Sequence, residues 1–280
     1  MNANKMTPQR YLVILEEYDQ ILAHARAMSE RLVGRTVTEK HMCYAETIFT
    51  KLLCHAVSLR KISPNLVSVP LPELWDIGSL CAVARSLIEA FDAFAYIGLH
   101  GVLQRVQELR LLVWELHGKE HRLHMLEEIG SVDADVNKIR SDAKILQVMV
   151  TAHASYKELP KGVQKMISDG KAPAYLQSKR DRNAASGINH YFYNSATMFL
   201  SQYVHTTPFA LSQLELSHAG DPDALQLVAM PLQYSMSFLA KTIVGVESLW
   251  PETRLPKSAR LRRILGLWLV VAEKGVRGVG

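Results

Sequence analysis

The stretch YNSATMFLSQYVH, from Tyr193 to His205, shows most directly how this chain folds. At about 100° per residue on a helix, its polar side chains form one narrow stripe, and apolar side chains fill most of the remaining circumference. The stripe, which holds no Lys, Arg, Asp or Glu, consists of His190, Asn194, Thr197, Ser201 and His205. Because a solvated helix face normally carries charged residues, we predict that this stripe faces other parts of the protein.

The rest of the chain has the same helical character. Apolar residues recur at helical spacing, no useful stretch alternates as a strand does, and no segment repeats at a fixed period. We expect helices near 7–34, 36–60, 72–99, 102–130, 133–159, 160–168, 190–205, 209–216, 222–250 and from 256 onward. The second of these opens with the capping-box spacing of Thr36 and Glu39. Short connections between helices favour antiparallel neighbours, so we predict an all-α, antiparallel bundle of about eight to ten helices without significant sheet.

The expected domain organisation is a single helical domain spanning 1–280. Within it we expect an N-terminal helical pair at 1–70, a bundle core at 71–216 and C-terminal helices with a basic tail at 217–280. The segment 170–187 has no apolar period and is typical of a linker. One domain is favoured over two lobes because the third, fourth and stripe-bearing helices are too apolar to lie unpaired on a surface.

Composition favours a globular cytoplasmic protein, which we expect to be bacterial and not bound to a membrane. Hydrophobic residues make up 48% of the chain. The longest apolar run near either end, ILGLWLVVA at Ile264–Ala272, is about half the length that a bilayer span needs. The N-terminal sequence MNANKMTPQR lacks the apolar core of a secretory signal. The three cysteines have no C-x-x-C spacing, so we expect reduced, buried thiols.

The net charge of +5 is concentrated in two segments. Seven Lys and Arg residues against two Glu lie from Glu252 to the C-terminus, and six against two Asp lie between Lys161 and Arg182. Such stretches are compatible with a phosphate-rich partner, and the candidate RNA-binding residues are Lys179, Arg180, Arg182, Arg260, Arg262 and Arg263. An ordinary solvated surface is the favoured alternative, because no aromatic residues alternate with these charges.

The third expected helix carries a second polar stripe. Between Leu80 and Leu99 nearly every residue is apolar or small, except for Arg85, Glu89, Asp92 and Tyr96, which share one face. An exposed Arg85–Glu89 pair would contribute about 0.2–0.5 kcal/mol, whereas a buried pair would need further hydrogen-bond partners. Ser201 and His205 could supply these, so we predict that the two stripes face each other inside the bundle.

The fourth expected helix offers a row of Arg110, His117, His121 and His124 along one edge. Three histidines on one face, with Glu120 beside them, could hold a metal ion. We favour a half-exposed border instead, because a second helix carrying the Glu-x-x-His motif of di-iron proteins is absent from the sequence. The expectation is therefore no metal and no cofactor.

Arg110 and His117 are separated by six residues, which matches the R-x(4–6)-H signature of the HEPN superfamily. HEPN proteins are helical domains that include metal-independent ribonucleases. Arg35 and His41 match the signature as well, and two matches are no more than this composition produces by chance. A role in phage defence or in a toxin system would follow only from analogy with that superfamily.

Two segments resemble an all-helical bacterial family that is known as a domain of unknown function. They are ARSLIEAFDAFAYIG, which contains Arg85 and Glu89, and YNSATMFLSQYVH, which contains Ser201 and His205. The family has an R-x-x-x-E helix early and an S-x-x-x-H helix late, and the resemblance covers about 71–216. It implies that these four residues belong to one site.

Two functions remain open. The favoured one is a binding or interaction module, in which Arg85, Glu89, Ser201 and His205 form a structural polar network. The alternative is a metal-independent RNA endonuclease, in which His205 transfers a proton, Arg85 stabilises the phosphorane and Glu89 holds the guanidinium. His117 would then be a second acid or base, and Arg110 would lie near the scissile phosphate. The expected partner is RNA or a protein, and a homodimer stays open.

Overall fold

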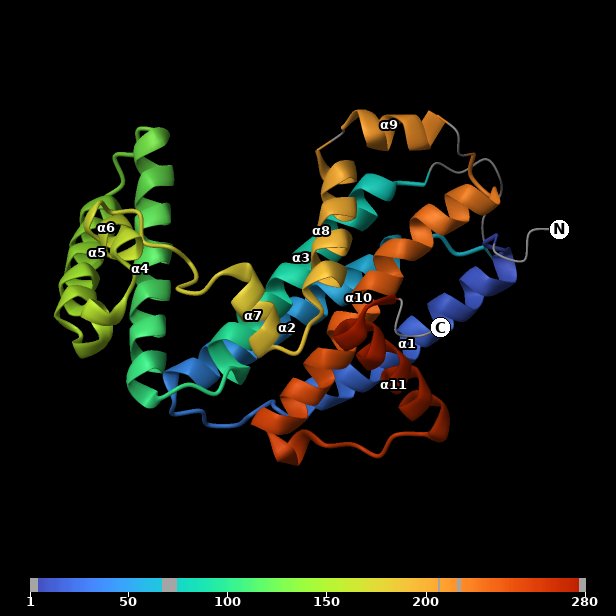
Figure 1. Cartoon of the computed structure of the whole chain (residues 1–280), viewed down its shortest axis with the longest axis horizontal. Coiled ribbons are helices and arrows are strands. Elements are labelled where there is room, and N and C mark those ends of the chain that lie inside the picture. Colours follow the sequence, from blue (N-terminus) through green and yellow to red (C-terminus); the bar gives the residue numbers. More distant parts are fainter. Residues whose placement is uncertain (1–4, 67–74, 206, 216–217, 277–280) are drawn as a thin grey trace. The chain divides into compact units, whose positions relative to one another are not determined.

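The computed structural model describes residues 5–66, 75–205, 207–215 and 218–276. Within these ranges the chain forms eleven α-helices and no strand, which confirms the all-α prediction (Figure 1). The helices are α1 (Pro8–Glu30), α2 (Lys40–Ile62), α3 (Ile77–Phe94), α4 (Gln104–Glu128), α5 (Asp135–Ala152), α6 (Lys161–Ser168), α7 (Lys179–Ala185), α8 (His190–Val204), α9 (Pro208–Glu215), α10 (Pro222–Leu249) and α11 (Ala259–Lys274).

The chain divides into two compact units. We call 1–99 together with 183–280 the large unit, and 100–182 the small unit. The second boundary falls inside 170–187, the segment that the sequence predicts to be a linker. That segment is irregular only in part, because 179–185 form α7 and the side chains of Arg182 and Asn183 are buried.

The core of the large unit is built around α10. This helix packs against α1, α3 and α11, and α3 also packs against α2 and α8. Asp221 and Pro222 begin α10 as the sequence predicts, since proline is favoured in the first turn of a helix. The helix is long and apolar enough to cross a membrane, but 72% of its most apolar window is buried inside the protein. It is therefore the core helix of the large unit.

The end of α3 is shaped by close packing against α10. After Phe94 the helix widens into a π-helical turn, Ala95–Leu99. Gly245 of α10 lies opposite this turn, and a Cβ atom placed there would come within 2.6 Å of Leu99 Cδ1. Real Cβ atoms do not approach other atoms so closely, so an added Cβ would force the Leu99 side chain to shift.

The helix that carries the polar stripe, α8, is held at its N-terminus by Asn189. The Asn189 side-chain oxygen accepts a hydrogen bond from Phe192 N at 3.0 Å, and the Asn189 backbone N–H donates to Ala272 O of α11 at 2.7 Å. Gly275, with φ 77°, ends α11 next to the same asparagine. One residue thus caps α8 and joins it to the end of α11.

The small unit has a core of its own. Helices α4 and α5 pack against each other, and α6 adds Ile167 to their interface. The buried apolar residues are Leu109, Val113, Leu116, Ala143, Val150, Ile167 and Ala172. Helix α5 ends at Ala152, before the predicted end at Leu159, because a short 3-10 turn, Ala154–Glu158, follows it.

Two local predictions were wrong. The capping-box spacing from Thr36 to Glu39 placed the start of the second helix too early, since α2 begins after Glu39, whose side chain makes no capping bond. Cys81 is buried as expected, but Cys43 and Cys54 are exposed. The predicted start of the third helix at Pro72 lies outside the described residues, and α3 is capped by Asp76, which accepts a hydrogen bond from Ser79 N.

Candidate functional site

The polar stripe of α8 faces protein over only part of its length. Thr197 is buried, and His190, Asn194 and Ser201 are half-buried. His205 follows the last turn of α8 and is exposed to solvent. The prediction that the whole stripe faces other protein is therefore correct for its middle and wrong for its C-terminal end.

The two hydroxyl side chains of the stripe bond the backbone of their own helix. The Thr197 hydroxyl donates to Tyr193 O at 2.9 Å, and the Ser201 hydroxyl donates to Thr197 O at 2.6 Å. Hydroxyl side chains in a helix commonly bond the carbonyl one turn earlier. These residues therefore need no charged or polar partner on α3.

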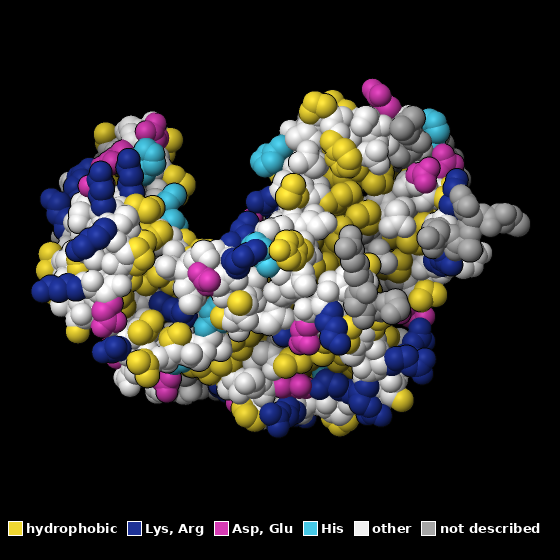
Figure 2. All heavy atoms as spheres, in the orientation of Figure 1, with side chains coloured by type: hydrophobic (Ala, Val, Ile, Leu, Met, Phe, Trp, Pro, Cys, Tyr) yellow, Lys and Arg dark blue, Asp and Glu magenta, His cyan; other side chains and the backbone are white. Residues whose placement is uncertain are grey.

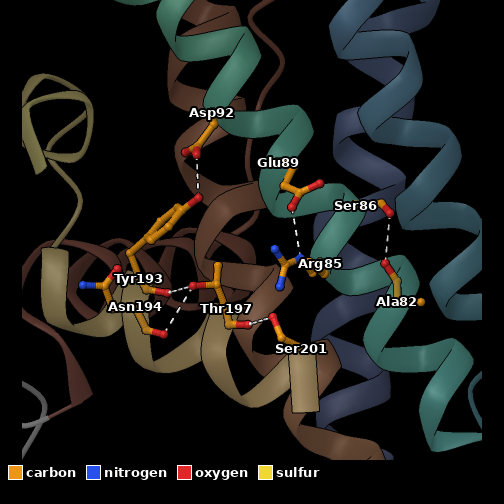
Figure 3. Close-up of polar contacts among 9 residues, drawn as sticks. All are labelled: Ala82, Arg85, Ser86, Glu89, Asp92, Tyr193, Asn194, Thr197 and Ser201. Atoms are coloured by element: carbon orange, nitrogen blue, oxygen red, sulfur yellow. Dashed lines mark hydrogen bonds and ion pairs between the residues drawn. The ribbon is translucent and has the colours of Figure 1, made fainter. Parts of the chain in front are cut away.

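Arg85 and Glu89 form an ion pair along α3. Arg85 Nε lies 3.0 Å from Glu89 Oε1, and the two side chains are 33% and 57% exposed (Figure 3). An exposed pair one turn apart contributes little to stability. The structure therefore does not show a buried Arg85–Glu89 pair, which would have required further hydrogen-bond partners.

The polar bridge between α3 and α8 is made by two other residues. The Tyr193 hydroxyl donates to Asp92 Oδ2 at 2.5 Å, and both side chains are buried (Figure 3). The sequence places Asp92 in the stripe of α3 but assigns Tyr193 to the apolar face of α8. A tyrosine on an apolar face can still reach a polar partner with its hydroxyl. The hydroxyl of Tyr193 is therefore the feature of the sequence that could have indicated this contact.

The predicted meeting of four groups inside the bundle is wrong for the exposed imidazole of His205, and for Arg85, Glu89 and Ser201 it stays a prediction. Among the described residues, no hydrogen bond or ion pair joins Arg85 or Glu89 to Ser201 or His205. The first two lie along α3, whereas Ser201 bonds its own helix and His205 is exposed. Their catalytic role stays a prediction without a shared pocket to support it.

The second predicted set, Arg110 and His117, lies on α4 in the small unit. Arg110 is only 2% exposed, so its guanidinium is not accessible to a phosphate in this structure. His117 is half-buried, and its Nδ1 lies 2.8 Å from the carbonyl oxygen of Ala172. The two residues therefore have different environments, although they share a helix.

His117 lies at the edge of a groove of about 620 Å³ within the small unit. Helix α4, helix α5 and the loop Gly170–Pro173 form its walls. The polar lining residues are His117, Glu120, His121, His124, Glu127, Arg140, Lys144, Gln147 and Lys171. Leu123, Ala143, Met166, Ala172 and Pro173 supply apolar surface between them.

Two side chains of α4 hold the loop through the backbone of Ala172. The Ala172 N–H donates to Glu120 Oε2 at 2.6 Å, and the Ala172 carbonyl accepts from His117 Nδ1. Because a carbonyl oxygen can only accept, Nδ1 carries the proton, and the neutral His117 ring keeps its lone pair on Nε2. Burial raises the pKa of Glu120, and the bond from Ala172 and the nearby His121 oppose that rise.

The charged side chains of the groove differ in their pairing. Arg140 donates to Glu127 Oε1 at 2.9 Å. Lys144 and Lys171 are exposed and form no ion pair or hydrogen bond within the described part of the chain. Lys171 belongs to the basic segment between Lys161 and Arg182, whereas Lys144 lies outside both basic segments. Nothing in the local pattern shows that α5 and the loop after Gly170 approach the histidines of α4.

The described histidines of the row are not grouped as three ligands around one point. The ring centres of His117 and His121 lie 4.2 Å apart, and the exposed His124 is 3.8 Å from Glu128. Across the described residues, no three His, Cys, Asp or Glu side chains are placed to bind one metal ion. Figure 2 shows histidine side chains along α4 and Lys and Arg side chains over the α5 and α6 side of the small unit.

The predicted basic residues have mixed environments. Arg180 and Arg263 are exposed, as is Lys179. Arg182 is buried, with its guanidinium carbon 3.9 Å from the centre of the Tyr175 ring. In the large unit, Arg260 pairs with Glu16 at 2.6 Å, and Arg262 donates to Lys257 O. Arg182 is thus a packing residue in this structure, and the others stay predictions for RNA contact.

Comparisons of the chain with protein-family models, with curated proteins and with solved structures found no match.

Proposed function

We propose that the chain is a binding module and that the groove of the small unit, between α4, α5 and the loop Gly170–Pro173, takes an anionic ligand. The observation that carries this proposal is the pair Lys144 on α5 and Lys171 on the loop, which line one groove and form no ion pair or hydrogen bond among the described residues. Single surface lysines are common, but two free ammonium groups in one groove can bind the same anion.

The dimensions of the groove support a small ligand. Its volume of about 620 Å³ lies within the range of roughly 300–1,000 Å³ that is typical of ligand pockets. Such pockets combine apolar surface with a few polar groups that fix the ligand's orientation. Leu123, Ala143 and Met166 provide the apolar surface here.

The groove is also held in shape before any ligand binds. Glu120 and His117 fix the backbone of Ala172, and Lys171 is its neighbour in sequence. A pre-formed site avoids the entropic cost of ordering a loop on binding. The two carboxylates of the lining already accept hydrogen bonds from the protein, Glu120 from Ala172 N–H and Glu127 from Arg140.

The test is a titration of the intact protein with sulfate, inorganic phosphate and succinate, followed by NMR chemical shifts of the backbone amides. We expect at least one anion to shift the resonances of α4, α5 and the Gly170–Pro173 loop. The double variant Lys144→Ala/Lys171→Ala should lose this response. The control Lys161→Ala/Lys165→Ala, which removes two exposed lysines of α6, should keep it. No response to any anion would refute the proposal.

A second candidate is the metal-independent ribonuclease. The observation that favours it is the Nδ1 bond of His117, which leaves Nε2 as a proton acceptor at the edge of the groove. Incubation of purified protein with total RNA tests this candidate. Cleavage that His117→Ala abolishes would support it, whereas cleavage that only His205→Ala abolishes would favour the α8 residue. An absence of cleavage would leave binding as the function.

A further inference from the structure

We infer that the ligand of the groove carries a phosphate group, and that the histidines of α4 become additional donors to it when they are protonated. This inference rests on the anion-binding function proposed above, and it adds the chemical class of the anion and a dependence on pH. It starts from the kind of donors that the groove offers.

The free donors of the groove are compact groups. Lys144 and Lys171 end in ammonium groups, which are point donors without a preferred plane. The only guanidinium of the lining belongs to Arg140, which is already bonded to Glu127. An arginine fork binds carboxylates and phosphates through two parallel hydrogen bonds, whereas lysine binds phosphate as a point charge. Ammonium and imidazole donors from different walls suit a tetrahedral anion, whose oxygens point in several directions.

Three histidines of α4 line the same groove. His117, His121 and His124 follow one another at helical spacing, so they share the face that the groove exposes. A neutral imidazole offers one donor, and a protonated imidazole offers two. For His117, whose Nδ1 already donates to Ala172, protonation converts Nε2 from an acceptor into a donor. Protonation therefore adds both charge and hydrogen-bonding capacity at the site.

The other charged groups facing these histidines are known. They are Glu120 and Glu127 on α4, Arg140 and Lys144 on α5, and Lys171 on the loop, while α6 contributes only Met166 to the lining. Glu128 of α4 lies outside the lining but faces His124 at 3.8 Å. With neutral histidines these six charged groups sum to zero, and each protonated histidine adds one positive charge. Histidine side chains in general gain their proton as the pH falls through the range of about 8 to 5. The groove thus becomes a stronger anion site on mild acidification.

A phosphate group would lose charge over the same pH range, since the second pKa of a phosphate monoester is about 6. Sulfate keeps its two charges throughout that range and has the same tetrahedral shape. A comparison of sulfate affinity at pH 7.5 and at pH 5.5 therefore reports the protonation of the protein alone. Succinate, a dicarboxylate, serves as the planar comparison at pH 7.5, where it too carries two charges.

The experiment is calorimetric titration of the intact protein at low ionic strength. We expect sulfate to bind about fivefold or more tightly at pH 5.5 than at pH 7.5, since an exposed ion pair contributes up to about 1 kcal/mol. At pH 7.5 we expect phosphate and sulfate to bind more tightly than succinate. The variant His121→Gln/His124→Gln should remove most of the pH dependence. The control His41→Gln/His218→Gln changes two histidines of the large unit and should preserve it.

The outcomes separate this inference from the function on which it rests. A sulfate affinity that does not change with pH, or that changes equally in both histidine variants, would overturn the role of the α4 histidines. Succinate binding as tightly as phosphate would overturn the phosphate assignment. In both cases the groove would still be an anion site. Failure of all three anions to bind would instead remove the proposed function itself.

Discussion

At the scale of single residues, a buried hydrogen bond from Tyr193 to Asp92 joins α8 to α3, which also pack against each other. Both side chains are buried, and the oxygen atoms lie 2.5 Å apart. A buried carboxylate depends on its donors, because a donor that is lost cannot be replaced by bulk water. The Arg85–Glu89 pair on the same helix is partly exposed and has no comparable importance.

We expect Tyr193→Phe to lower the free energy of unfolding by about 1–3 kcal/mol, because it removes a donor from a buried carboxylate. Denaturant titration followed by circular dichroism measures the change. Tyr191→Phe is the matched control, since Tyr191 lies on the same helix and is 74% exposed. Equal effects of the two substitutions would show that the bond to Asp92 contributes nothing.

A second residue-scale prediction concerns His100. Burial, reinforced by Arg110 and Arg182, lowers the pKa of His100 to about 4. In the unfolded chain a histidine has a pKa near 6.5. Above that pH the residue is neutral in both states, and below it the unfolded chain binds the extra proton. Stability is therefore lost as the pH falls from about 6.5 towards 4.

Between pH 7 and pH 5.5, His100 should account for a loss of about 1 kcal/mol. His100→Gln should flatten the pH dependence of the unfolding free energy by that amount. His218→Gln, at an exposed position, should leave the dependence unchanged. A pH profile identical for His100→Gln and the unaltered protein would contradict this prediction.

At the scale of elements, helix positions follow from local chemistry where proline or glycine marks an end. The starts at Pro8 and Pro222 and the end of α11 at Gly275, which has a positive φ, are examples. The start of α2 is an exception. Arg35 lies 5.5 Å from the centre of the Trp250 ring and pairs with Glu252, so tertiary contacts hold the preceding segment and override the capping signal of Thr36.

The contact of Gly245 with the π-helical turn gives the element-scale prediction. Gly245→Ala should destabilise the protein by about 1–3 kcal/mol, because the added methyl group overlaps Leu99 in a filled interior. Gly266→Ala is the matched control within α11, where no atom lies within 4 Å of the added Cβ. That change should stabilise the helix by up to about 1 kcal/mol. Thermal denaturation of the two variants checks the opposite signs.

At the scale of the whole molecule, the chain has two hydrophobic cores where the sequence favours one domain. Leu239 belongs to the core of the large unit and Leu116 to that of the small unit, and both are fully buried. We expect two calorimetric transitions, with the small unit unfolding at the lower temperature because its core contains fewer apolar side chains. Leu116→Ala should then move only the first transition, and Leu239→Ala only the second. A single transition shifted by both variants would mean one cooperative domain.

The sequence was sufficient for the helical class and for most helix positions, because these depend on spacing along the chain. It was insufficient for the site. Lys144 and Lys171 are distant from the histidines of α4 in sequence, and only the packing of α5 and the loop onto α4 brings them to one groove. The burial of individual side chains could not be predicted from the sequence either, since Arg110 and His117 share a helix and differ in their access to solvent.

The anchoring of the Gly170–Pro173 loop has an evolutionary consequence. Glu120 and His117 form hydrogen bonds with the backbone of Ala172, and these bonds hold the loop. The side chain of the neighbouring Lys171 forms none of them. Position 171 is therefore free to change identity while the loop keeps its path. A substitution at this one position can change which ligand the groove binds, while the helices that form the groove keep their sequence and packing.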